Sequence, residues 1–423
     1  MINSSDNSLR VAVIGAGVRG TNLARKLSSS GFDVSVTAVA EPDYEKRMSF
    51  ATEIGLNREA LYTGWEELTE KVSDCDAAII ATLDNQHAGP AIACINRGWH
   101  ILLEKPLADT LDDCKLIVKT QRERKKIVAV CHTLRFMEGY LRVKQILADG
   151  AIGTLIHVEH MEAIGNLRFA HNYVRGRWAI AKNNTFLLLH KCSHDIDYIN
   201  WLFTEQCLRV SSFGSLKYFT QDNAPQGSTK RCTDGCTLID TCPYSAVRIY
   251  VDAPLDKWPA GEVSTIHTRE EHMNAVKNGP YGICVWHAGN DVVDHQVVMM
   301  EFEGGATATC TLSGYSASNG RRIRLQGTLG ELLFDEAAGT ISVKRFAGGN
   351  DKIIKIEAAG TYHPEDQIIV DEWLSSIINS TSVTVDAGEA LRTHAVVFAA
   401  EQSRIENRRI EMSEVFPDPA TFR

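Results

Sequence analysis

The sequence predicts an α/β domain with a doubly wound parallel sheet, followed by an α+β domain with an open, mostly antiparallel sheet. Three observations support this prediction. Short apolar runs alternate with helical patterns in the first third of the chain, longer strand-like runs dominate residues 208–343, and the length of 423 residues exceeds one typical domain. We therefore expect two domains, which comprise residues 1–135 and 136–423.

Strands and helices of the first domain follow one another in strict order. Runs rich in apolar and β-branched residues are typical of buried strands, and helical patterns such as VRGTNLARKLSSS separate them. Strict alternation implies right-handed crossovers between parallel strands, which is the basis of the predicted sheet. The strand-like runs are RVAVIGAG, VSVTAVAEP, DAAIIAT, HILLEK and IVAVCH.

The pattern changes after about residue 136. GYLRVKQILADGAIG predicts a helix that ends at glycine, and LIHVEHMEAI begins the longer strands. The pair Gly304-Gly305 marks a hairpin turn, and helical patterns at 363–380 and 387–406 close the chain. One polar stretch, TQDNAPQGSTKRCTDG, is a loop-like insertion among the strands.

Composition argues against several classes of partner. With 44 Lys and Arg against 53 Asp and Glu, the net charge is −9, which disfavours binding to nucleic acid. No apolar run reaches the roughly 18 to 20 residues that cross a bilayer, and the N-terminus lacks a secretory pattern. We expect a soluble, cytoplasmic protein that binds no membrane, in which most of the 11 cysteines are reduced thiols, buried or metal-bound.

Gly15, Gly17 and Gly20 form a GxGxxG motif between the first strand and the first helix. In this context the motif predicts a dinucleotide site, with the pyrophosphate at the helix N-terminus. Glu41 ends the next strand, where a carboxylate accepts hydrogen bonds from ribose hydroxyls and repels a 2′-phosphate, so NAD is favoured over NADP. Arg47 nearby would favour NADP, because a basic residue can accept that phosphate. We also expect cofactor contacts from Val18 and Arg19.

HILLEKPL places Glu104, Lys105 and Pro106 at the carboxyl end of a parallel strand, where open α/β sheets bind ligands. A lysine there is often only a solvated strand end. Near a nicotinamide, however, an ammonium group can bind a substrate hydroxyl and, with a lowered pKa, help to remove its proton.

These stretches resemble the glucose-fructose oxidoreductase and inositol dehydrogenase family (Gfo/Idh/MocA). The resemblance rests on VAVIGAGVRG, IIATLDNQHAGPAIACINRGWHILLEKPLA, RFMEGYLRVKQILADGAIG, HDIDYINWL and GTLGEL, spread over residues 10–334. It implies a Rossmann domain with an open-faced sheet domain, polyol or sugar-like substrates, and homodimers or homotetramers formed through that sheet. Within the second stretch we expect further cofactor contacts from Thr82, His87, Glu104 and Lys105.

The stretch LLLHKCSHDIDYINWLF, residues 187–203, predicts an amphipathic helix. At 100° per residue, His190, His194 and Asp197 fall on one side and the apolar residues on the other. Histidines four apart can bind zinc, but Lys191 occupies the position of the glutamate in HExxH and opposes a metal. A histidine pair in a core helix and a catalytic face remain as the other interpretations.

The resemblance favours the catalytic interpretation of this helix. Similar enzymes carry an Asp four residues before a His, which work with the EKP lysine. His194 matches that histidine, whereas His190 replaces the aspartate and Lys191 follows it. We predict that His194 is the general acid/base with Lys105 as its partner, and that Lys191 or His190 contacts substrate. Asp197 is a further candidate substrate contact.

Two other groups of residues each have more than one possible role. HNYVRGRW contains Tyr173 and Arg175, whose aromatic and guanidinium groups suit a sugar or carboxylate, although a structural loop explains them equally. Cys232, Cys236 and Cys242 form C-x3-C-x5-C in the insertion, which fits a structural zinc site, free thiols or a disulfide.

The predicted function is NAD-dependent hydride transfer from or to a hydroxyl-bearing carbon of a sugar, sugar acid or cyclitol. Two alternatives follow from the same resemblance: an NAD-dependent glycosidase that works by transient oxidation and elimination, and a non-catalytic NAD-binding regulator. Retention of Lys105 and His194 argues against the regulator, because a pure sensor needs no proton relay.

Overall fold

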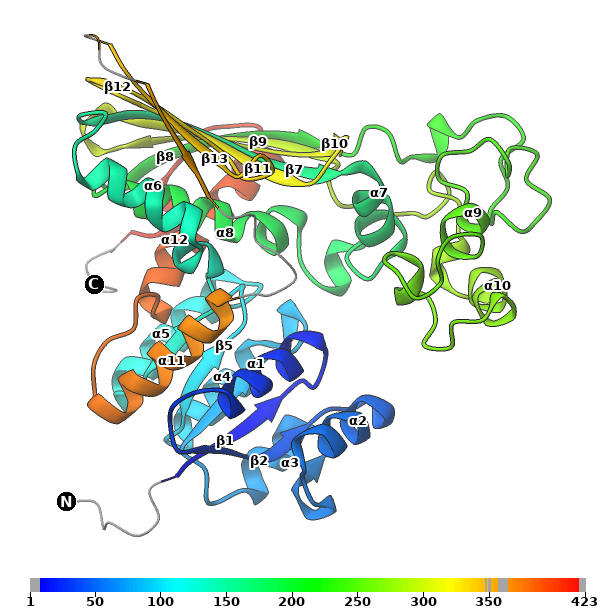
Figure 1. The fold of residues 1–423 in the computed structure, drawn as a ribbon, viewed down its shortest axis with the longest axis horizontal. Helices are drawn as coiled ribbons and strands as arrows, with labels where there is room; N and C mark the ends of the chain where they lie inside the picture. The colour runs from blue at the N-terminus through cyan, green and yellow to red at the C-terminus, as the bar shows by residue number, and fades with distance from the viewer. Residues whose placement is uncertain (1–7, 347, 349–350, 357–363, 418–423) are drawn as a thin grey trace.

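The computed structural model describes residues 8–346, 348, 351–356 and 364–417. Two sheets dominate it, one in each of the two large bodies seen in Figure 1. The described helices include none with the combined length and apolarity needed to cross a membrane.

The first sheet has six parallel strands in the order β3-β2-β1-β4-β5-β6. The order reverses between β1 and β4, so the crevice beyond their carboxyl ends is the expected ligand position. This architecture confirms the predicted doubly wound domain. Its strands are β1 (Leu9–Ile14), β2 (Val34–Ala40), β3 (Leu61–Tyr62), β4 (Ala77–Ile80), β5 (His100–Leu103) and β6 (Val128–Val130).

Helices connect these strands in the predicted alternation. They begin at local signals; for example, the Thr110 hydroxyl oxygen accepts a hydrogen bond from the Asp113 amide at the start of α5. The helices are α1 (Val18–Ser28), α2 (Tyr44–Ile54), α3 (Trp65–Lys71), α4 (Ala88–Asn96) and α5 (Leu111–Arg124), with 3-10 turns η1 (Arg58–Ala60), η2 (Asp84–Gln86) and η3 (Thr133–Phe136).

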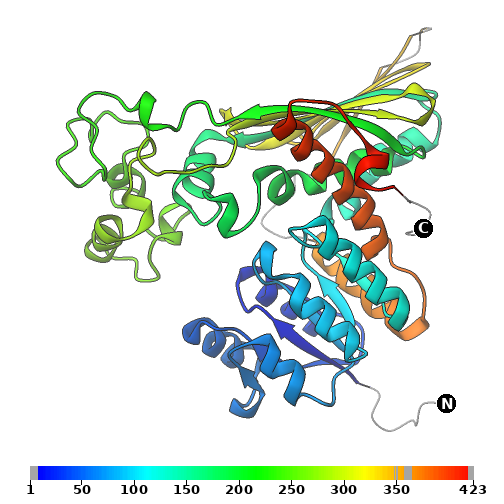
Figure 2. The same ribbon diagram turned by 180° about the vertical axis from the view of Figure 1, so that it is seen from behind.

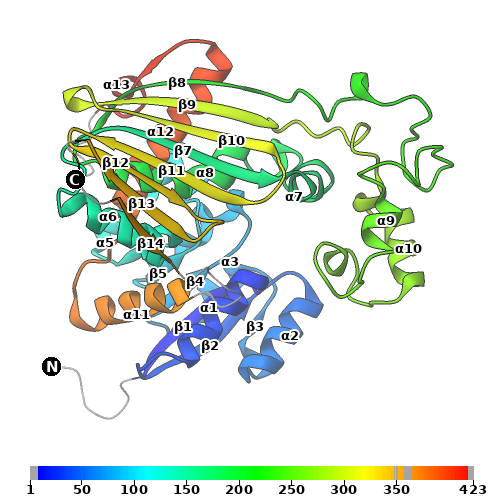
Figure 3. The same ribbon diagram turned by 45° about the horizontal axis from the view of Figure 1, so that its top comes forward.

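The second sheet has nine strands in the order β14-β13-β12-β11-β7-β10-β9-β8-β15 (Figure 3). Neighbours pair antiparallel except β10 with β7, which confirms the predicted mostly antiparallel sheet. The strands are β7 (Leu155–Gly165), β8 (Cys207–Ser215), β9 (His295–Phe302), β10 (Thr307–Ser316), β11 (Gly320–Gly327), β12 (Gly330–Asp335), β13 (Thr340–Arg345), β14 (Lys352–Lys355) and β15 (Ile410–Glu411).

Three helices lie under one face of this sheet, between it and the first domain (Figure 1). They are α6 (Glu138–Ala148), α8 (Leu187–Leu202) and α12 (Ala387–Glu406). The predicted amphipathic helix is α8, but its polar side is largely covered: Asp197 is fully buried, and His190 and His194 are half-buried. Asp197 is covered by Arg135 and by Thr393 of α12, and His190 contacts Asp84 of the first domain.

The C-terminal helices return to the first domain. α11 (Pro364–Asn379) packs on α1, and α12 runs from the nine-stranded sheet to α5 (Figure 2). Trp373, Leu374 and Leu391 belong to the same apolar core as the strands of the six-stranded sheet. The first core therefore contains chain from both sides of residue 135. A short helix, α13 (Met412–Val415), follows β15.

Residues 216–294 form a separate lobe between β8 and β9 (Figures 1 and 3). The sequence predicts that strand-like runs dominate residues 208–343 around a loop-like insertion at 220–235, but the irregular part is longer. The segment contains turns and short helices around a small core that includes Tyr250 and Val276. Other apolar residues of the segment, among them Phe219, Tyr244 and Trp286, pack into the core of the nine-stranded sheet domain instead. The lobe contains η6 (Gln221–Asn223), α9 (Ala246–Tyr250), η7 (Ala260–Glu262), α10 (Arg269–Asn278) and η8 (Pro280–Gly282).

Short helical segments also join the longer elements. After β7 the chain forms α7 (Asn166–Phe169), a π-helical turn η4 (Ala170–Arg175) and η5 (Ala181–Asn183) before α8 begins. The predicted hairpin at Gly304-Gly305 is present as η9 (Glu303–Gly305), between the antiparallel strands β9 and β10.

Candidate active site

The glycine-rich turn joins β1 to α1 at the carboxyl edge of the parallel sheet. Gly15 has a φ of +92°, and a Cβ atom on it would lie 2.6 Å from the Ala81 carbonyl oxygen. A Cβ atom on Gly20 would lie 1.9 Å from the Gly15 carbonyl oxygen, so both positions require glycine. No side chain caps α1, whose first residues follow Gly17, so its N-terminal amides are available to an anion.

Glu41 lies beside this turn at the end of β2. Its carboxylate accepts hydrogen bonds from the amides of Ala16, at 2.9 Å, and Asp43, at 3.1 Å. Arg47, the residue that would favour NADP, donates from its guanidinium to the backbone carbonyl oxygens of Glu41 and Pro42. The Glu41 carboxylate therefore lies next to the glycine-rich turn, while the Arg47 guanidinium is bound by backbone carbonyls.

Arg19 connects three elements around the strand end that carries the EKP motif. Its Nε donates to Glu104 at 2.7 Å, and its terminal nitrogens donate to both carboxylate oxygens of Asp366 on α11, at 2.7 and 2.9 Å. Burial lowers the pKa of Arg19, but the two carboxylates outweigh it and raise the pKa above its ordinary value. Val18, by contrast, is 79% exposed at the start of α1.

The turn after β4 contacts the EKP turn directly. His87 Nδ1 donates to the Pro106 carbonyl oxygen at 2.6 Å, and His87 Nε2 is buried without a hydrogen-bond partner among the described residues. The Thr82 hydroxyl donates to the Gln86 carbonyl oxygen at 3.1 Å. The His87 bond joins the turns after β4 and β5, and the Thr82 bond lies within the turn after β4, at the edge where the cofactor contacts are predicted.

Lys105 projects from this edge to α8. Its Nζ donates to the His190 carbonyl oxygen at 2.7 Å. Burial lowers the pKa of Lys105, against the opposing effect of the carboxylates Asp84 and Glu104. The predicted lysine and the predicted helix therefore meet, although Lys105 contacts the backbone of the helix rather than the imidazole of His194.

A carboxylate that the sequence analysis did not single out completes this contact. Asp84, in the turn after β4, accepts a hydrogen bond from His190 Nδ1 at 2.7 Å. The ring of His190 also lies 4.7 Å from that of Trp178 and 5.9 Å from that of Tyr173, measured between centroids. Asp84 follows a parallel strand just as Lys105 does, so the argument from strand ends that identified Lys105 applies to it as well.

His194 lies one turn further along α8, in a row of three imidazoles. Its ring centroid is 5.5 Å from that of His132, which is 5.7 Å from that of His394. Burial, Lys105 and His132 lower the pKa of His194 well below its ordinary value, so the ring is neutral. His194 Nδ1 is buried without a partner among the described residues. The sequence analysis did not single out His132, although it ends the run IVAVCH.

Lys191 belongs to a buried ionic network on the sheet side of α8. Its Nζ lies 2.8 Å from a Glu162 oxygen, and Arg321 Nε lies 2.8 Å from the other Glu162 oxygen and 2.6 Å from Asp195. Asp195 also accepts a hydrogen bond from His160 at 2.7 Å. The network ties α8 to β7 and β11, and the side chain of Lys191 keeps 18% exposure.

Asp197 and Arg175 are held by other parts of the protein. Asp197 is fully buried and accepts two hydrogen bonds of 2.8 Å from Arg135 and one of 3.1 Å from Thr393. Arg175 donates to the carbonyl oxygens of Ile283, at 2.6 Å, and Tyr244, at 2.7 Å, and so anchors the lobe of residues 216–294. Of the three predicted substrate contacts, only Tyr173 adjoins the His190 ring.

The cysteine cluster does not support the zinc prediction. Cys232, Cys236, Cys242 and Cys284 line one small cavity, but all four are free thiols. In the part of the chain that the structure describes, no group of three or more Cys, His, Asp or Glu side chains is arranged to hold a metal ion. Burial raises the pKa of Cys242 and Cys284, which disfavours the thiolates that zinc requires. The disulfide alternative is likewise absent from these positions.

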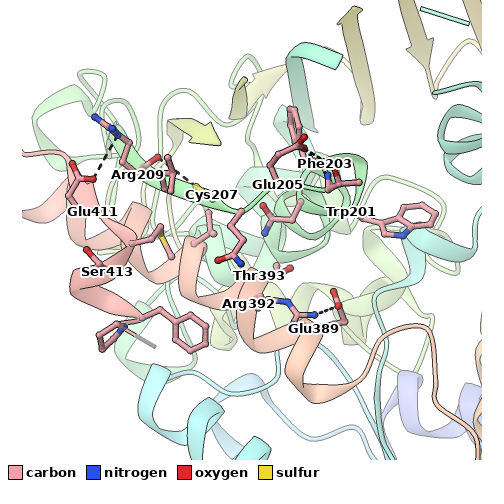
Figure 4. A pocket seen from close by; sticks show the side chains of 18 of the residues that line it. Trp201, Phe203, Glu205, Cys207, Arg209, Glu389, Arg392, Thr393, Glu411 and Ser413 are labelled. Carbon is pink, nitrogen blue, oxygen red and sulfur yellow. Dashed lines mark hydrogen bonds and ion pairs between the residues drawn. The ribbon is translucent and has the colours of Figure 1, made fainter. Parts of the chain in front are cut away.

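A larger cavity of about 1090 Å³ lies elsewhere, at the C-terminal end of α8 (Figure 4). It is lined by residues of α8, β8, α12 and α13, among them Trp201, Arg209 and Thr393. It contains none of the predicted catalytic or cofactor residues, so the site is located by chemistry and topology rather than by cavity size.

Comparison with known families agrees with this arrangement. Residues 9–132 match the family described as "Oxidoreductase family, NAD-binding Rossmann fold", and residues 144–412 match the "Oxidoreductase family, C-terminal alpha/beta domain". Among curated proteins, inositol 2-dehydrogenase 1 of Saccharopolyspora erythraea is 28% identical over 48% of this chain and 57% of that protein. The chain spans 55% to 61% of the length of the first relatives it matches.

Solved structures share the fold. An oxidoreductase from Agrobacterium radiobacter, in complex with NAD+, L-tartaric acid and magnesium, has a TM-score of 0.70 at 15% identity and covers 97% of this chain and 100% of its own. The scyllo-inositol dehydrogenase of Lactobacillus casei, with NAD(H) and scyllo-inositol bound, has a TM-score of 0.67 at 14% identity over 96% of this chain and 100% of its own. Neither the glycosidase nor the regulator alternative gains support from these matches.

Proposed function

The chain belongs to the Gfo/Idh/MocA oxidoreductase family, and we propose that it transfers a hydride between NAD and the hydroxyl-bearing carbon of a sugar, sugar acid or cyclitol. The proposal rests on one observation: Lys105 Nζ donates a hydrogen bond to the His190 carbonyl oxygen of α8. This contact lies at the carboxyl edge of the parallel sheet, next to the glycine-rich turn. The name and bound ligand of the inositol dehydrogenases cited above support this substrate class.

The residues present fit a dinucleotide. Gly15 and Gly20 allow the tight turn, since a Cβ atom on either would clash with backbone, whereas Gly17 faces open space. The N-terminus of α1 is uncapped, and the Glu41 carboxylate lies beside this turn. Glu41 would bind the ribose hydroxyls and favour NAD over NADP, because Arg47 is already engaged by backbone carbonyls. When bound, the nicotinamide supplies the hydride acceptor or donor.

The protein's own residues would move the proton. Oxidation of a hydroxyl requires a base, and both Lys105 and His194 have lowered pKa values that favour their neutral, basic forms. They come from the end of β5 and from α8, which meet at the hydrogen bond from Lys105 Nζ to the His190 carbonyl oxygen. We assign the acid/base role to this pair, and substrate contacts to His190, Lys191 and Tyr173.

A screen of sugars, sugar acids and cyclitols with NAD tests the proposal. We expect at least one of them to give NADH, followed by its absorbance, and to raise the melting temperature only when NAD is present. Binding of NAD without NADH formation from any of them would contradict the dehydrogenase function. Release of an aglycone from a glycoside without accumulation of NADH would instead indicate redox-neutral glycoside cleavage.

A further inference from the structure

Asp84 and His190 form a buried pair that joins the two domains. Asp84 lies in the turn after β4 and His190 on α8, and Oδ2 and Nδ1 are 2.7 Å apart. The side chains keep only 9% and 12% exposure. Because the pair is largely shielded from water, its hydrogen bond is stronger and more directional than one on the surface.

The charge of the pair fixes which ring nitrogen of His190 carries the proton. Burial opposes ionisation of Asp84, but the hydrogen bond from His190 and the charge of Lys105 lower the pKa of Asp84 to about 2. Burial and Lys105 lower the pKa of His190 to about 4. At neutral pH an ionised carboxylate can only accept, so Nδ1 of the neutral ring is the donor and Nε2 is left with a lone pair.

The surroundings of His190 hold the ring but leave Nε2 free. Trp178 and Tyr173 flank it with their rings. Lys105 Nζ donates to the His190 carbonyl oxygen at 2.7 Å, so the predicted catalytic lysine contacts the residue that carries this imidazole. Within the described residues, no hydrogen bond reaches His190 Nε2.

We propose that Asp84 is a positioning residue, which holds His190 with Nδ1 protonated so that Nε2 accepts a hydrogen bond from a substrate hydroxyl. The inference rests on the proposed hydride transfer and adds a requirement to it. The substrate presents a hydroxyl hydrogen to Nε2 in addition to the hydroxyl that is oxidised, which a polyol with neighbouring hydroxyl groups satisfies. The proton of the oxidised hydroxyl leaves through Lys105 and His194, while His190 stays neutral throughout.

The test is Asp84→Asn, with Asp112→Asn as the matched control on an exposed carboxylate. The new amide can donate to Nδ1, which favours the opposite tautomer and turns Nε2 into a donor. We expect kcat/KM for the polyol to fall by about a hundredfold, the direction seen when the carboxylate beside a catalytic imidazole becomes an amide. The KM for NAD should change little, and the control should match wild type.

Two readouts separate positioning from a merely structural role. Nitrogen-15 NMR of histidine-labelled protein, which needs no substrate, should report Nδ1–H for His190 in wild type and Nε2–H in Asp84→Asn. The pH profile should also move. The Asp84 carboxylate raises the pKa of Lys105, and the other charged neighbours of Lys105 are Glu104, Lys191 and Arg19. Asp84→Asn removes only the Asp84 charge, so the pKa of Lys105 falls and the acidic limb of the oxidation rate shifts to lower pH.

A second variant, His190→Asn, keeps the proposal testable if Asp84→Asn does not fold. His190→Asn keeps an amide donor for Asp84 but lacks Nε2, so it should lose activity as Asp84→Asn does, and the double variant should lose no more than either single one. An Nε2–H tautomer in wild type, or wild-type kcat/KM in either variant, would overturn the inference. A wild-type protein that forms no NADH with any polyol would instead remove the proposed function.

Discussion

Burial and two nearby carboxylates have opposite effects on the pKa of Lys105. Burial favours the neutral amine, whereas Asp84 and Glu104 favour the ammonium form, and burial prevails, so the pKa is lowered. A lysine poised in this way can bind a substrate hydroxyl and accept its proton. His194 has a lowered pKa for the same principal reason, which leaves an imidazole able to act as a base.

Replacing either base should therefore impair the chemical step. We expect Lys105→Met and His194→Ala each to lower turnover by about a hundredfold or more, the scale of acid/base catalysis. Steady-state NADH formation measures this, with Lys119→Met as a control on an exposed lysine. Turnover near that of wild type in both variants would contradict the assigned roles.

Glu41 should determine the choice of cofactor. We expect Glu41→Ala to reduce the preference for NAD over NADP by about tenfold or more, because a charged hydrogen bond contributes roughly 1.5 to 3 kcal/mol. The ratio of kcat/KM for the two cofactors is the measurement, since it cancels any general loosening of the turn that Glu41 supports. Glu45→Ala on the exposed side of α2 is the control. An unchanged ratio would argue against the ribose contact.

The places of single residues in the fold were predictable where position along one element was sufficient. Lys105 and Glu41 follow strands, and the ends of parallel strands share one edge whatever else the protein does. Asp84 lies 106 residues before His190, and their pairing depends on how α8 docks against the other domain. No local pattern in either segment contains that information.

At the scale of single elements, α8 shows how context changes a helix that is recognisable from sequence. Its residue range and its two-sided pattern were predictable, but the pattern does not specify the partners of the ionisable residues. In the structure these residues are buried or half-buried and form pairs: Lys191 with Glu162, and Asp197 with Arg135. Buried charges require such partners, since an unpaired charge is strongly destabilising.

Helix α11 is the element whose placement most affects stability. Trp373 is fully buried in the core of the parallel sheet, although it lies near the other end of the chain. We expect Trp373→Ala to lower the free energy of unfolding by about 3 to 5 kcal/mol. Denaturant unfolding measures the change, and Ile378→Ala, at a position that is 53% exposed on the same helix, should change it little. A small effect at Trp373 would contradict a shared core.

At the scale of the whole molecule, the nine-stranded sheet has one covered face and one open face. Cross-strand register places Phe213 opposite Val297 and Leu333 opposite Ser342, on the same side as Met299 and Ile353. The side chains of Phe213, Met299, Leu333 and Ile353 are between 38% and 72% exposed. Apolar side chains gathered on an open sheet face favour contact with another surface.

We expect a second copy of the chain to cover this face, in a homodimer or homotetramer. Light scattering after gel filtration should then give a multiple of the 46.8 kDa chain mass. Phe213→Asp with Met299→Asp should shift the population toward monomer, since each buried apolar side chain contributes about 1.5 to 3 kcal/mol. Ile405→Asp is the control, at an exposed position on α12, the helix under the covered face of the sheet. A wild-type monomer at all concentrations would refute the prediction.

The sequence by itself determined the order of strands and helices, the glycine-rich turn, the acid after β2, the lysine after β5 and the range of α8. Each of these depends on local periodicity or on a turn that only glycine permits. The tertiary structure alone decided that Asp84 pairs with His190, that Asp197 pairs with Arg135 and that Arg175 binds the Tyr244 carbonyl oxygen. It alone decided that α11 completes the first core and that residues 216–294 form a lobe. Those outcomes come from contacts between segments far apart in the chain, where burial forces each charge to find a partner that no local pattern specifies.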